Sequence, residues 1–267
     1  MGPQGAKPGD LSATERFDLH GQVVIVTGGG KGIGRVYVQE FARAGAHVVA
    51  ADIDGAAAQE AASELSAEGR QAIGLTADIS NPADVQAMVR STVEAFGSVD
   101  VLINNASLMS VLPRRGFMEI PVEEWDQVMA VNLRGLLLCC QAVTPLMRAR
   151  GRGKIINISS SRVWEGTPFR LHYTTSKAGV VGFTRALARE LGPDNIQVNA
   201  VTPGATLSET QVASSSGNYL AALVDGRSLQ RPQYPQDLVG TVMFLASRAS
   251  DFITGQTINV DGGRAMH

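Results

Sequence analysis

The stretch VVIVTGGGKGIG, residues 23–34, decides how this chain can fold. Its first five residues are all β-branched, as expected of a strand covered on both faces. Glycines follow at once, and a segment of helical period begins at Gly34. A strand, a glycine-rich turn and a helix start place free backbone N–H groups and the positive helix end together, which suits a pyrophosphate. The stretch therefore predicts a phosphate-binding turn, and a purely structural glycine turn is the alternative.

Further short apolar runs alternate with longer stretches of helical period along the chain. This alternation is typical of parallel strands joined by right-handed crossover helices, so we predict a doubly wound, seven-stranded α/β sheet with helices on both faces. The expected strands are Val23–Thr27, His47–Ala51, Gln71–Thr76, Val101–Asn104, Lys154–Ile158, Gln197–Val201 and Thr257–Val260. The clearest expected helices are Gly34–Ala44, Ala56–Gly69 and Pro82–Phe96.

We expect a single folded domain over residues 19–267, preceded by a flexible arm over residues 1–18. The arm is polar and has no apolar signal core. Residues 205–235 are irregular and rich in Ser, Gly and Pro. Long loops of this kind in a compact domain often act as lids, so we predict a substrate lid there, with a surface loop of no function as the alternative.

Composition excludes several classes of protein. The chain has 267 residues, 44% of them hydrophobic, and a net charge of −2. Nucleic-acid-binding chains usually carry a basic excess, so no nucleic-acid partner is expected. The longest strongly apolar run, 135–143, is about half a membrane span, so no membrane partner is expected. The neighbouring Cys139 and Cys140 are interpreted as core residues of a cytoplasmic protein.

Asp52, at the end of the second expected strand, bears on which nucleotide binds. A carboxylate there can accept both ribose hydroxyls of an adenosine and would repel a 2′-phosphate. Lys31 in the glycine turn favours the opposite choice, because a cation there would meet that phosphate. Ile53 follows Asp52 where a phosphate pocket would favour arginine, so the sequence favours NAD over NADP. The alternative is that Asp52 and Asp54 only cap the next helix.

Tyr173 and Lys177 stand four residues apart in YTTSK, a spacing that places them on one face of a helix. A phenol has an ordinary pKa of about 10, but a nearby ammonium favours the phenolate. Such a pair can protonate a carbonyl oxygen or remove the proton of an alcohol. The segment INISSS, 156–161, precedes the pair at an expected strand end, where sheets of this kind bind ligands. Taken alone, the spacing would more often mark a surface pair.

Together these motifs resemble those of the short-chain dehydrogenase/reductase family. TGGGKGIG resembles that family's TGxxxGxG turn, YTTSK its YxxxK, and NNAS at 104–107 its NNAG with serine in place of glycine. The other matching positions are Asp78 in TADIS, Asn132 in VNLRG, Ser160 in ISS, TPG at 202–204 and ITGQTINVDGG at 253–263. The resemblance covers the chain from Leu19 onward and implies one Rossmann-type domain.

The resemblance implies hydride transfer between NAD(H) and an alcohol or carbonyl compound, with Tyr173 as the general acid/base. Lys177 would hold the nicotinamide ribose and lower the phenol pKa, Ser160 would donate to the substrate oxygen, and Asn132 would anchor a water that carries protons toward Lys177. The implied cofactor-binding residues are Gly28, Lys31, Gly32, Ile33, Gly34, Asp52, Ile53, Asp78, Ile79, Asn105, Ala106, Tyr173, Lys177, Pro203, Gly204, Thr206 and Ser208.

The resemblance also implies an assembly, because family members commonly pair through the helices after the fourth and fifth strands. The apolar segments Gly135–Met147 and Ala178–Leu191 would supply that surface, so a homotetramer or homodimer is expected. The nearest alternative function is an NADPH-dependent reductase of 3-oxoacyl chains or related carbonyls. A nucleotide-sensing protein that keeps the fold without turnover is a second alternative.

The substrate pocket is expected between Ser160 and Tyr173 and in the loop after NNAS. Its predicted lining is Leu108, Met109, Arg162, Trp164 and Phe169, an apolar and partly aromatic wall that suits a hydrophobic or aromatic alcohol and its ketone. The segment VWEGTP also resembles a branch of the family that acts on aryl alcohols and pyridoxal-like compounds. Ordinary packing of these aromatic side chains is the alternative.

Arginines occur in the same two segments, namely Arg162 and Arg170 in the first and Arg114 and Arg115 in the second. Arginine near an active site binds a carboxylate or phosphate through two parallel hydrogen bonds, which would indicate an acidic substrate. Solvated side chains and subunit contacts are the alternatives. The histidines show no metal-ligand spacing, so no metal is expected, and His172 is predicted to point away from its neighbour Tyr173.

Overall fold

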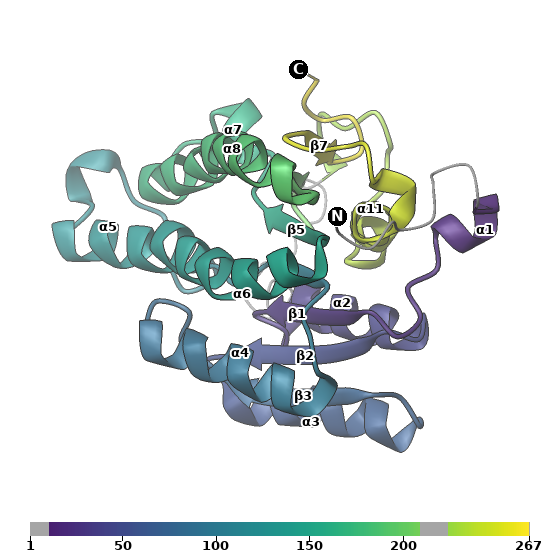
Figure 1. Ribbon diagram of the computed structural model, residues 1–267. Coiled ribbons are helices and arrows are strands. Elements are labelled where there is room, and N and C mark those ends of the chain that lie inside the picture. The colour runs from purple at the N-terminus through teal and green to yellow at the C-terminus, as the bar shows by residue number, and fades with distance from the viewer. Residues whose placement is uncertain (1–10, 209–223, 267) are drawn as a thin grey trace.

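The computed structural model describes residues 11–208 and 224–266 (Figure 1). Seven parallel strands form one sheet in the order β3-β2-β1-β4-β5-β6-β7, which confirms the predicted doubly wound fold. Their bounds are β1 Val23–Thr27, β2 His47–Asp52, β3 Ala72–Thr76, β4 Val101–Asn104, β5 Gly153–Ile158, β6 Ile196–Pro203 and β7 Thr257–Val260. The order reverses between β1 and β4, and a switch point of this kind is where such sheets bind ligands.

Helices cover both faces of the sheet. The side chains of α2, α3 and α11 join one apolar core, and those of α4, α6 and α8 join the other. The helix bounds are α1 Ala13–Arg16, α2 Gly32–Arg43, α3 Gly55–Ala67, α4 Pro82–Phe96, α5 Val122–Met129, α6 Leu136–Arg150, α7 Arg162–Glu165, α8 Leu171–Leu191 and α11 Gln236–Ala246. Single 3₁₀ turns lie at Phe117–Glu119, Gly192–Asp194 and Arg248–Ser250.

Local sequence explains where these elements begin and end. β1 is buried at every position, as its β-branched composition predicts. Asn81 caps α4 by accepting a hydrogen bond from the N–H of Ala83 at 2.9 Å, and Pro82 occupies the first helical position. Gly97 ends α4 at a φ of +80°, a left-handed conformation that glycine adopts without strain.

Helix α5 continues into α6 through a π-helical turn, Ala130–Gly135, so the helical stretch runs from Val122 to Arg150. By length and composition this stretch is apolar enough to cross a membrane. In the fold, however, α6 packs its apolar side chains into the core, as a core helix of a globular domain does. Both cysteines of α6 are buried free thiols, as predicted, and burial raises the pKa of Cys139 to about 12.

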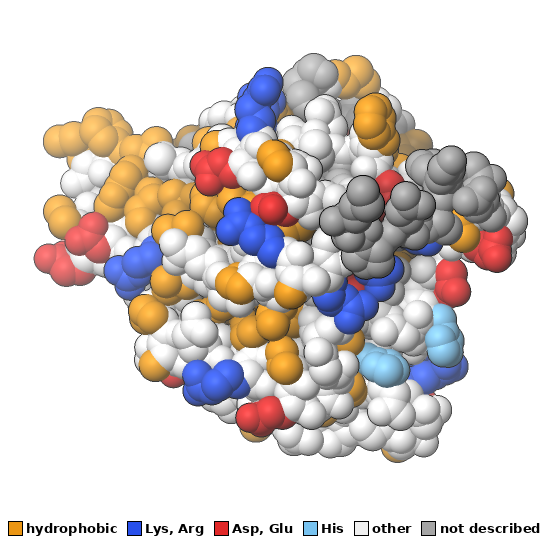
Figure 2. Space-filling model, viewed as in Figure 1, with side chains coloured by type: hydrophobic (Ala, Val, Ile, Leu, Met, Phe, Trp, Pro, Cys, Tyr) orange, Lys and Arg blue, Asp and Glu red, His pale blue; other side chains and the backbone are white. Residues whose placement is uncertain are grey.

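An exposed apolar patch lies at the start of this helical stretch. Phe117, Met118 and Val122 are exposed there, and Figure 2 shows hydrophobic side chains gathered over the α5 end of the molecule. Patches of this kind on a globular protein commonly mark interaction surfaces.

Parts of the two irregular segments predicted from the sequence lie outside the described residues, namely 1–10 of the arm and 209–223 of the lid. The rest of the arm is structured, because Ser12 and Glu15 form a capping box on α1 and the Phe17 ring lies 6.3 Å from that of Phe244 in α11. Part of the predicted arm thus forms a short helix, and the flexibility of the arm stays a prediction. In the described part of the lid, Thr206 and Gln233 form a β-bridge.

Candidate active site

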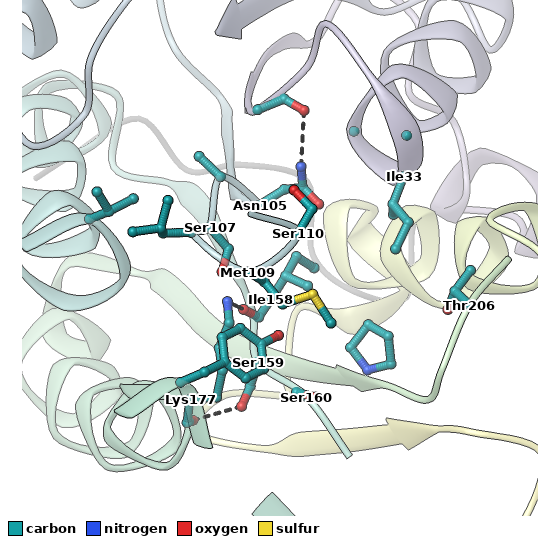
Figure 3. Close-up of a pocket in the computed structure, with 18 of the residues that line it drawn as sticks. Ile33, Asn105, Ser107, Met109, Ser110, Ile158, Ser159, Ser160, Lys177 and Thr206 are labelled. Atoms are coloured by element: carbon teal, nitrogen blue, oxygen red, sulfur yellow. Dashed lines mark hydrogen bonds between the residues drawn. The ribbon is translucent and has the colours of Figure 1, made fainter. Parts of the chain in front are cut away.

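A cavity of about 1010 Å³ opens at the carboxyl ends of the strands. Residues at or just after the ends of β1 to β6 line it, because parallel strands bring these ends to one edge of the sheet. Every residue predicted to bind the cofactor lies in its lining. Figure 3 shows Asn105, Ser160, Lys177 and Thr206 arranged around this space.

The glycine-rich turn between β1 and α2 forms a cradle at the cavity. Gly28 has a φ of +65°, and a Cβ there would come within 2.9 Å of the Cα of Ala106. A Cβ on Gly34 would overlap the carbonyl oxygen of Gly28. The Nδ2 of Asn105 donates to the carbonyls of Thr27 at 3.0 Å and Gly28 at 3.1 Å, which fixes the turn. This close-packed backbone beside the first N–H groups of α2 fits a pyrophosphate.

Asp52 and Asp54, after β2, have different contacts. The Asp52 carboxylate lines the cavity and accepts from the N–H of Gly30 and of Asp54, both at 3.0 Å. Asp54 is the N-cap of α3 and also accepts from the Nζ of Lys31 at 2.6 Å. Helix capping therefore falls on Asp54, and the alternative that Asp52 only caps a helix is wrong. The Lys31 ammonium has its counter-charge within the protein.

The other predicted cofactor residues are held by local hydrogen bonds. The Asp78 carboxylate accepts from the N–H of Ser80 at 2.8 Å and from its hydroxyl at 2.7 Å. After β6, the Thr206 hydroxyl donates to the carbonyl of Gly204 at 3.0 Å, and Thr206 and Ser208 are both buried. These short links give the cavity wall polar groups of fixed position.

Three of the four predicted catalytic residues meet at this cavity. Ser160 follows β5, while Tyr173 and Lys177 lie one turn apart on α8 and are buried. The Nζ of Lys177 donates to the carbonyl of Ile158 at 2.8 Å and lies 5.8 Å from the centre of the Tyr173 ring. The hydroxyl of Ser159 donates to the Lys177 carbonyl at 2.7 Å, away from the phenol. Of these neighbouring serines, Ser160 is therefore the partner of Tyr173.

Burial dominates the charges of this pair. It raises the pKa of Tyr173, although hydrogen bonding to Ser160 and the charges of Arg162 and Arg170 lower it. Burial also lowers the pKa of Lys177 to about 7. The charges of Arg162 and Arg170 lower the pKa of Tyr173, and the expected effect of Lys177 on that pKa stays a prediction.

Asn132, the fourth predicted catalytic residue, does not line the cavity; it lies buried in the π-helical turn. Its Oδ1 accepts from the N–H of Leu108 at 2.8 Å and the hydroxyl of Ser107 at 3.3 Å, and its Nδ2 donates to the hydroxyl of Ser176 at 3.0 Å. Ser176 in turn donates to the carbonyl of Tyr173 at 2.7 Å. The Asn132 side chain therefore links the loop after β4 to α8.

The predicted aromatic wall of the substrate pocket is wrong. Leu108, Met109 and Arg162 line the cavity, but Trp164 and Phe169 do not. The indole N–H of Trp164 donates to the hydroxyl of Thr202 at 3.3 Å, so this ring packs on β6. Phe169 adopts a left-handed conformation, with a φ of +67°, and its side chain is 52% exposed. Neither ring therefore forms part of the cavity wall.

Polar residues complete the lining instead. They include Ser110, Arg114, Gln127, Glu165, Thr167, Arg170 and Arg264. The sequence indicated Arg114 and Arg170 as residues near the pocket, but not Gln127 or Arg264. Gln127 lies on α5 and Arg264 near the chain end, and no motif links either to the catalytic segment; only the tertiary fold brings them together.

His172, which was predicted to point away from Tyr173, does not line the cavity. It is fully buried, and its Nε2 is 3.1 Å from a carboxylate oxygen of Glu124 on α5. Within residues 11–208 and 224–266, no cluster of histidine, cysteine, aspartate and glutamate side chains could hold a metal ion.

Comparison with known proteins gives a consistent result. A family model described as "Enoyl-(Acyl carrier protein) reductase" matches residues 28–265. A (2S)-[(R)-hydroxy(phenyl)methyl]succinyl-CoA dehydrogenase subunit of Thauera aromatica is 39% identical over 250 residues, which cover 93% of this chain and 98% of the relative.

Solved structures superpose on this chain over nearly its whole length. A 7α-hydroxysteroid dehydrogenase in complex with NADH and 7-oxoglycochenodeoxycholic acid superposes with a TM-score of 0.90 at 29% identity, covering 96% of this chain and 99% of the other. A 3-ketoacyl-(acyl-carrier-protein) reductase from Brucella melitensis in complex with NADH gives a TM-score of 0.84 at 33% identity, covering 93% and 100%. The match thus spans nearly the whole fold and includes the glycine turn and the catalytic helix, and the chain belongs to the short-chain dehydrogenase/reductase family of oxidoreductases.

Proposed function

We propose that the protein transfers a hydride between NAD(H) and a secondary alcohol or its ketone. The observation that carries the proposal is the meeting of Ser160, Tyr173 and Lys177 at the cavity that also contains the glycine cradle. When bound, the nicotinamide supplies the hydride donor or acceptor. The protein's own residues then have to bind the carbonyl compound, hold its oxygen and move one proton.

Tyr173 is the proposed acid/base. Its hydroxyl donates a proton to the substrate oxygen during reduction and accepts one during oxidation, while Ser160 donates a hydrogen bond to the same oxygen. Lys177 is proposed to hold the nicotinamide ribose, and Asn132 to serve a proton relay toward Lys177. The Asn132 side chain is already bonded to Leu108 and Ser176, which supports a positioning role for it in that relay.

NAD is the proposed cofactor in preference to NADP. The position of the Asp52 carboxylate at the cavity wall supports this choice, because its remaining lone pairs would accept ribose hydroxyls and its charge would repel a 2′-phosphate. The ion pair of Lys31 with Asp54 supports it too, since this cation is already compensated.

The proposed substrate has a hydrophobic or aromatic body beside the reacting carbon. Leu108 and Met109 in the cavity lining support this, and so do the names of two similar proteins, one of which includes a phenyl group and the other a steroid. An NADPH-dependent reductase of 3-oxoacyl chains is the second candidate, which the similarity to a 3-ketoacyl reductase favours.

Replacement of Tyr173 by phenylalanine tests the mechanism. We expect kcat to fall by roughly 10²- to 10⁴-fold, because the only group lost is the acid/base hydroxyl. Binding of NADH, followed by its fluorescence, should change by less than about 3-fold, since the ring keeps its packing. Near-normal turnover of Tyr173→Phe with a panel of alcohols and ketones would overturn the proposed chemistry.

We further propose that the protein is a cytoplasmic homotetramer, or a homodimer. The exposed apolar patch of Phe117, Met118 and Val122 supports association, since burying such side chains from water is favourable. Multi-angle light scattering at micromolar concentration measures the assembly, and a monomeric mass would overturn this proposal.

A further inference from the structure

The substrate end of the cavity carries several positive charges. Arg114 comes from the loop after β4, Arg162 begins α7, and Arg170 precedes α8. The charges of Arg114 and Arg170 both act on Arg162, and those of Arg162 and Arg170 act on the Tyr173 hydroxyl. These three arginines and Tyr173 therefore line one cavity, and the charges of Arg162 and Arg170 act on the tyrosine hydroxyl.

The acidic residue at this end, Glu165, already has an ion-pair partner and hydrogen-bond donors within the protein. Its carboxylate accepts from Arg264 at 2.9 Å and from the hydroxyls of Ser161 at 2.6 Å and Thr167 at 3.3 Å. Asp52 and Asp78 line the opposite, nucleotide end of the cavity. Glu165 pairs with Arg264 and its charge also acts on Arg162, so at this end one carboxylate faces four arginines of the lining, and the described residues leave an excess of positive charge there.

Arg162 is held by backbone groups instead of by a carboxylate. Its Nη2 donates to the carbonyls of Thr167 and Pro168, both at 3.0 Å. Its Nε is buried and has no hydrogen-bond partner in the part of the chain that the structure describes. Arg114 is exposed, with its guanidinium carbon 5.9 Å from the centre of the Phe169 ring. Neither arginine makes an ion pair with a carboxylate among residues 11–208 and 224–266.

Burying a cation without a counter-charge is costly, and a ligand that brings an anion removes that cost. A neutral hydrophobic ligand would increase it, because it would displace water from Arg162 and supply no acceptor. The planar fork of a guanidinium matches two oxygens of a carboxylate or a phosphate.

We propose that the substrate carries an anionic group, a carboxylate or phosphate, which Arg162 binds with help from Arg114 and Arg170. This inference rests on the proposed hydride transfer and deepens it by naming the substrate class. The substrate would then be a hydroxy acid or oxo acid whose reacting oxygen lies at Tyr173 and Ser160 and whose anion lies toward α7.

Matched pairs of compounds test the proposal. Benzoylacetate, 3-benzoylpropionate and 4-benzoylbutyrate vary the spacing between the ketone and the carboxylate, and each is compared with its methyl ester. A 2-oxo-2-phenylethyl phosphonate and its dimethyl ester form a second arm, which separates carboxylate from phosphate-like recognition. We measure kcat/KM for reduction with NADH, and binding of each acid to the protein–NADH complex by calorimetry.

We expect one acid to exceed its ester by roughly 10- to 100-fold, the range for a charge-assisted bidentate pair. Arg162→Gln and Arg114→Ala should reduce this ratio toward one, mainly through KM. Arg90→Gln, an exposed charge on α4 far from the lining, is the matched control and should keep the ratio. Because Arg162 also holds its loop, Arg114→Ala keeps the test valid if Arg162→Gln does not fold.

Esters that equal or exceed the acids at every spacing would overturn the inference, as would a preference that survives both arginine variants. The failure of the proposed function has a different signature, namely no reduction of any compound. In that case calorimetry still decides the anion site, because Arg114→Ala must weaken binding of the acid and leave binding of the ester unchanged.

Discussion

Asp52 provides the sharpest test of cofactor choice. Asp52→Asn keeps the shape of the side chain and removes its charge, whereas Asp54→Asn removes an equal charge two residues away. Asp52 lines the cavity, but Asp54 caps α3 and pairs with Lys31. The two variants therefore separate direct contact with a nucleotide from the general charge of this turn.

The expected effect can be estimated from the position of the carboxylate. Two unit charges about 4 Å apart repel by about 4 kcal/mol at an effective dielectric constant of about 20, and by about 1 kcal/mol in water. Asp52 is half-buried, so we take about 2 kcal/mol, or about 30-fold in the ratio of the NADPH and NADH dissociation constants. The amide introduced by Asp52→Asn would also lose one of the two backbone hydrogen bonds that the carboxylate accepts, which costs about 1 kcal/mol of stability.

Fluorescence titration of each variant with NADH and NADPH measures both constants. The unaltered protein should bind NADH more tightly, Asp52→Asn should reduce this preference by about 30-fold, and Asp54→Asn should change it by less than about 3-fold, because exposed ion pairs contribute little. Tighter binding of NADPH by the unaltered protein would refute the reasoning. So would equal shifts in the two variants, which would assign the preference to general charge.

Three further predictions follow from particular residues. Gly34→Ala should abolish detectable NADH binding, because a Cβ would overlap the Gly28 carbonyl. Gly240→Ala on α11 is the control, since a Cβ there meets nothing within 4 Å. It should bind NADH normally and gain up to about 1 kcal/mol in the free energy of urea unfolding. Burial lowers the pKa of Lys177 to about 7, so between about pH 7 and 10.5 the unfolded chain binds more protons than the folded protein, and the free energy of unfolding rises with pH. Lys177→Met should therefore stabilise the protein more at pH 6 than at pH 10. Equal effects at the two pH values in urea unfolding would contradict this. Oxidation of a hydroxy acid should reach its maximal rate at a higher pH than oxidation of its methyl ester, and coincident pH–rate profiles would disprove the arginine–phenol coupling.

The sequence predicted the sheet well because each strand has its own local signal. β1 is a run of β-branched residues before glycines, and α4 begins at Asn81-Pro82 and ends before Gly97, so its bounds need no tertiary information. The glycines Gly28 and Gly34 could also be predicted from the sequence, because the neighbouring backbone leaves no room for a Cβ at these positions.

The residues that line the proposed substrate pocket could not be predicted from the sequence in this way. Residues 162–170 form one short turn of helix and irregular chain, where no periodicity fixes which side chains face the cavity. Phe169 has a left-handed backbone and is exposed, and Trp164 has a hydrogen-bond partner on β6. Arg264 comes from beyond β7 and reaches Glu165 across the fold. Such choices depend on tertiary packing, which composition and spacing do not encode.

The charges around Tyr173 link the binding of an anion to the direction of the reaction. Lys177 has a pKa of about 7 when buried and so is only partly charged at neutral pH, whereas arginine stays protonated. Arg162 and Arg170 are therefore the permanent cations that favour the phenolate. An anion bound to them cancels part of their field and raises the pKa of Tyr173. The protonated phenol is the form that donates to a ketone, so an anionic substrate should favour proton donation, and hence reduction, while a neutral ester leaves the phenolate more accessible for oxidation.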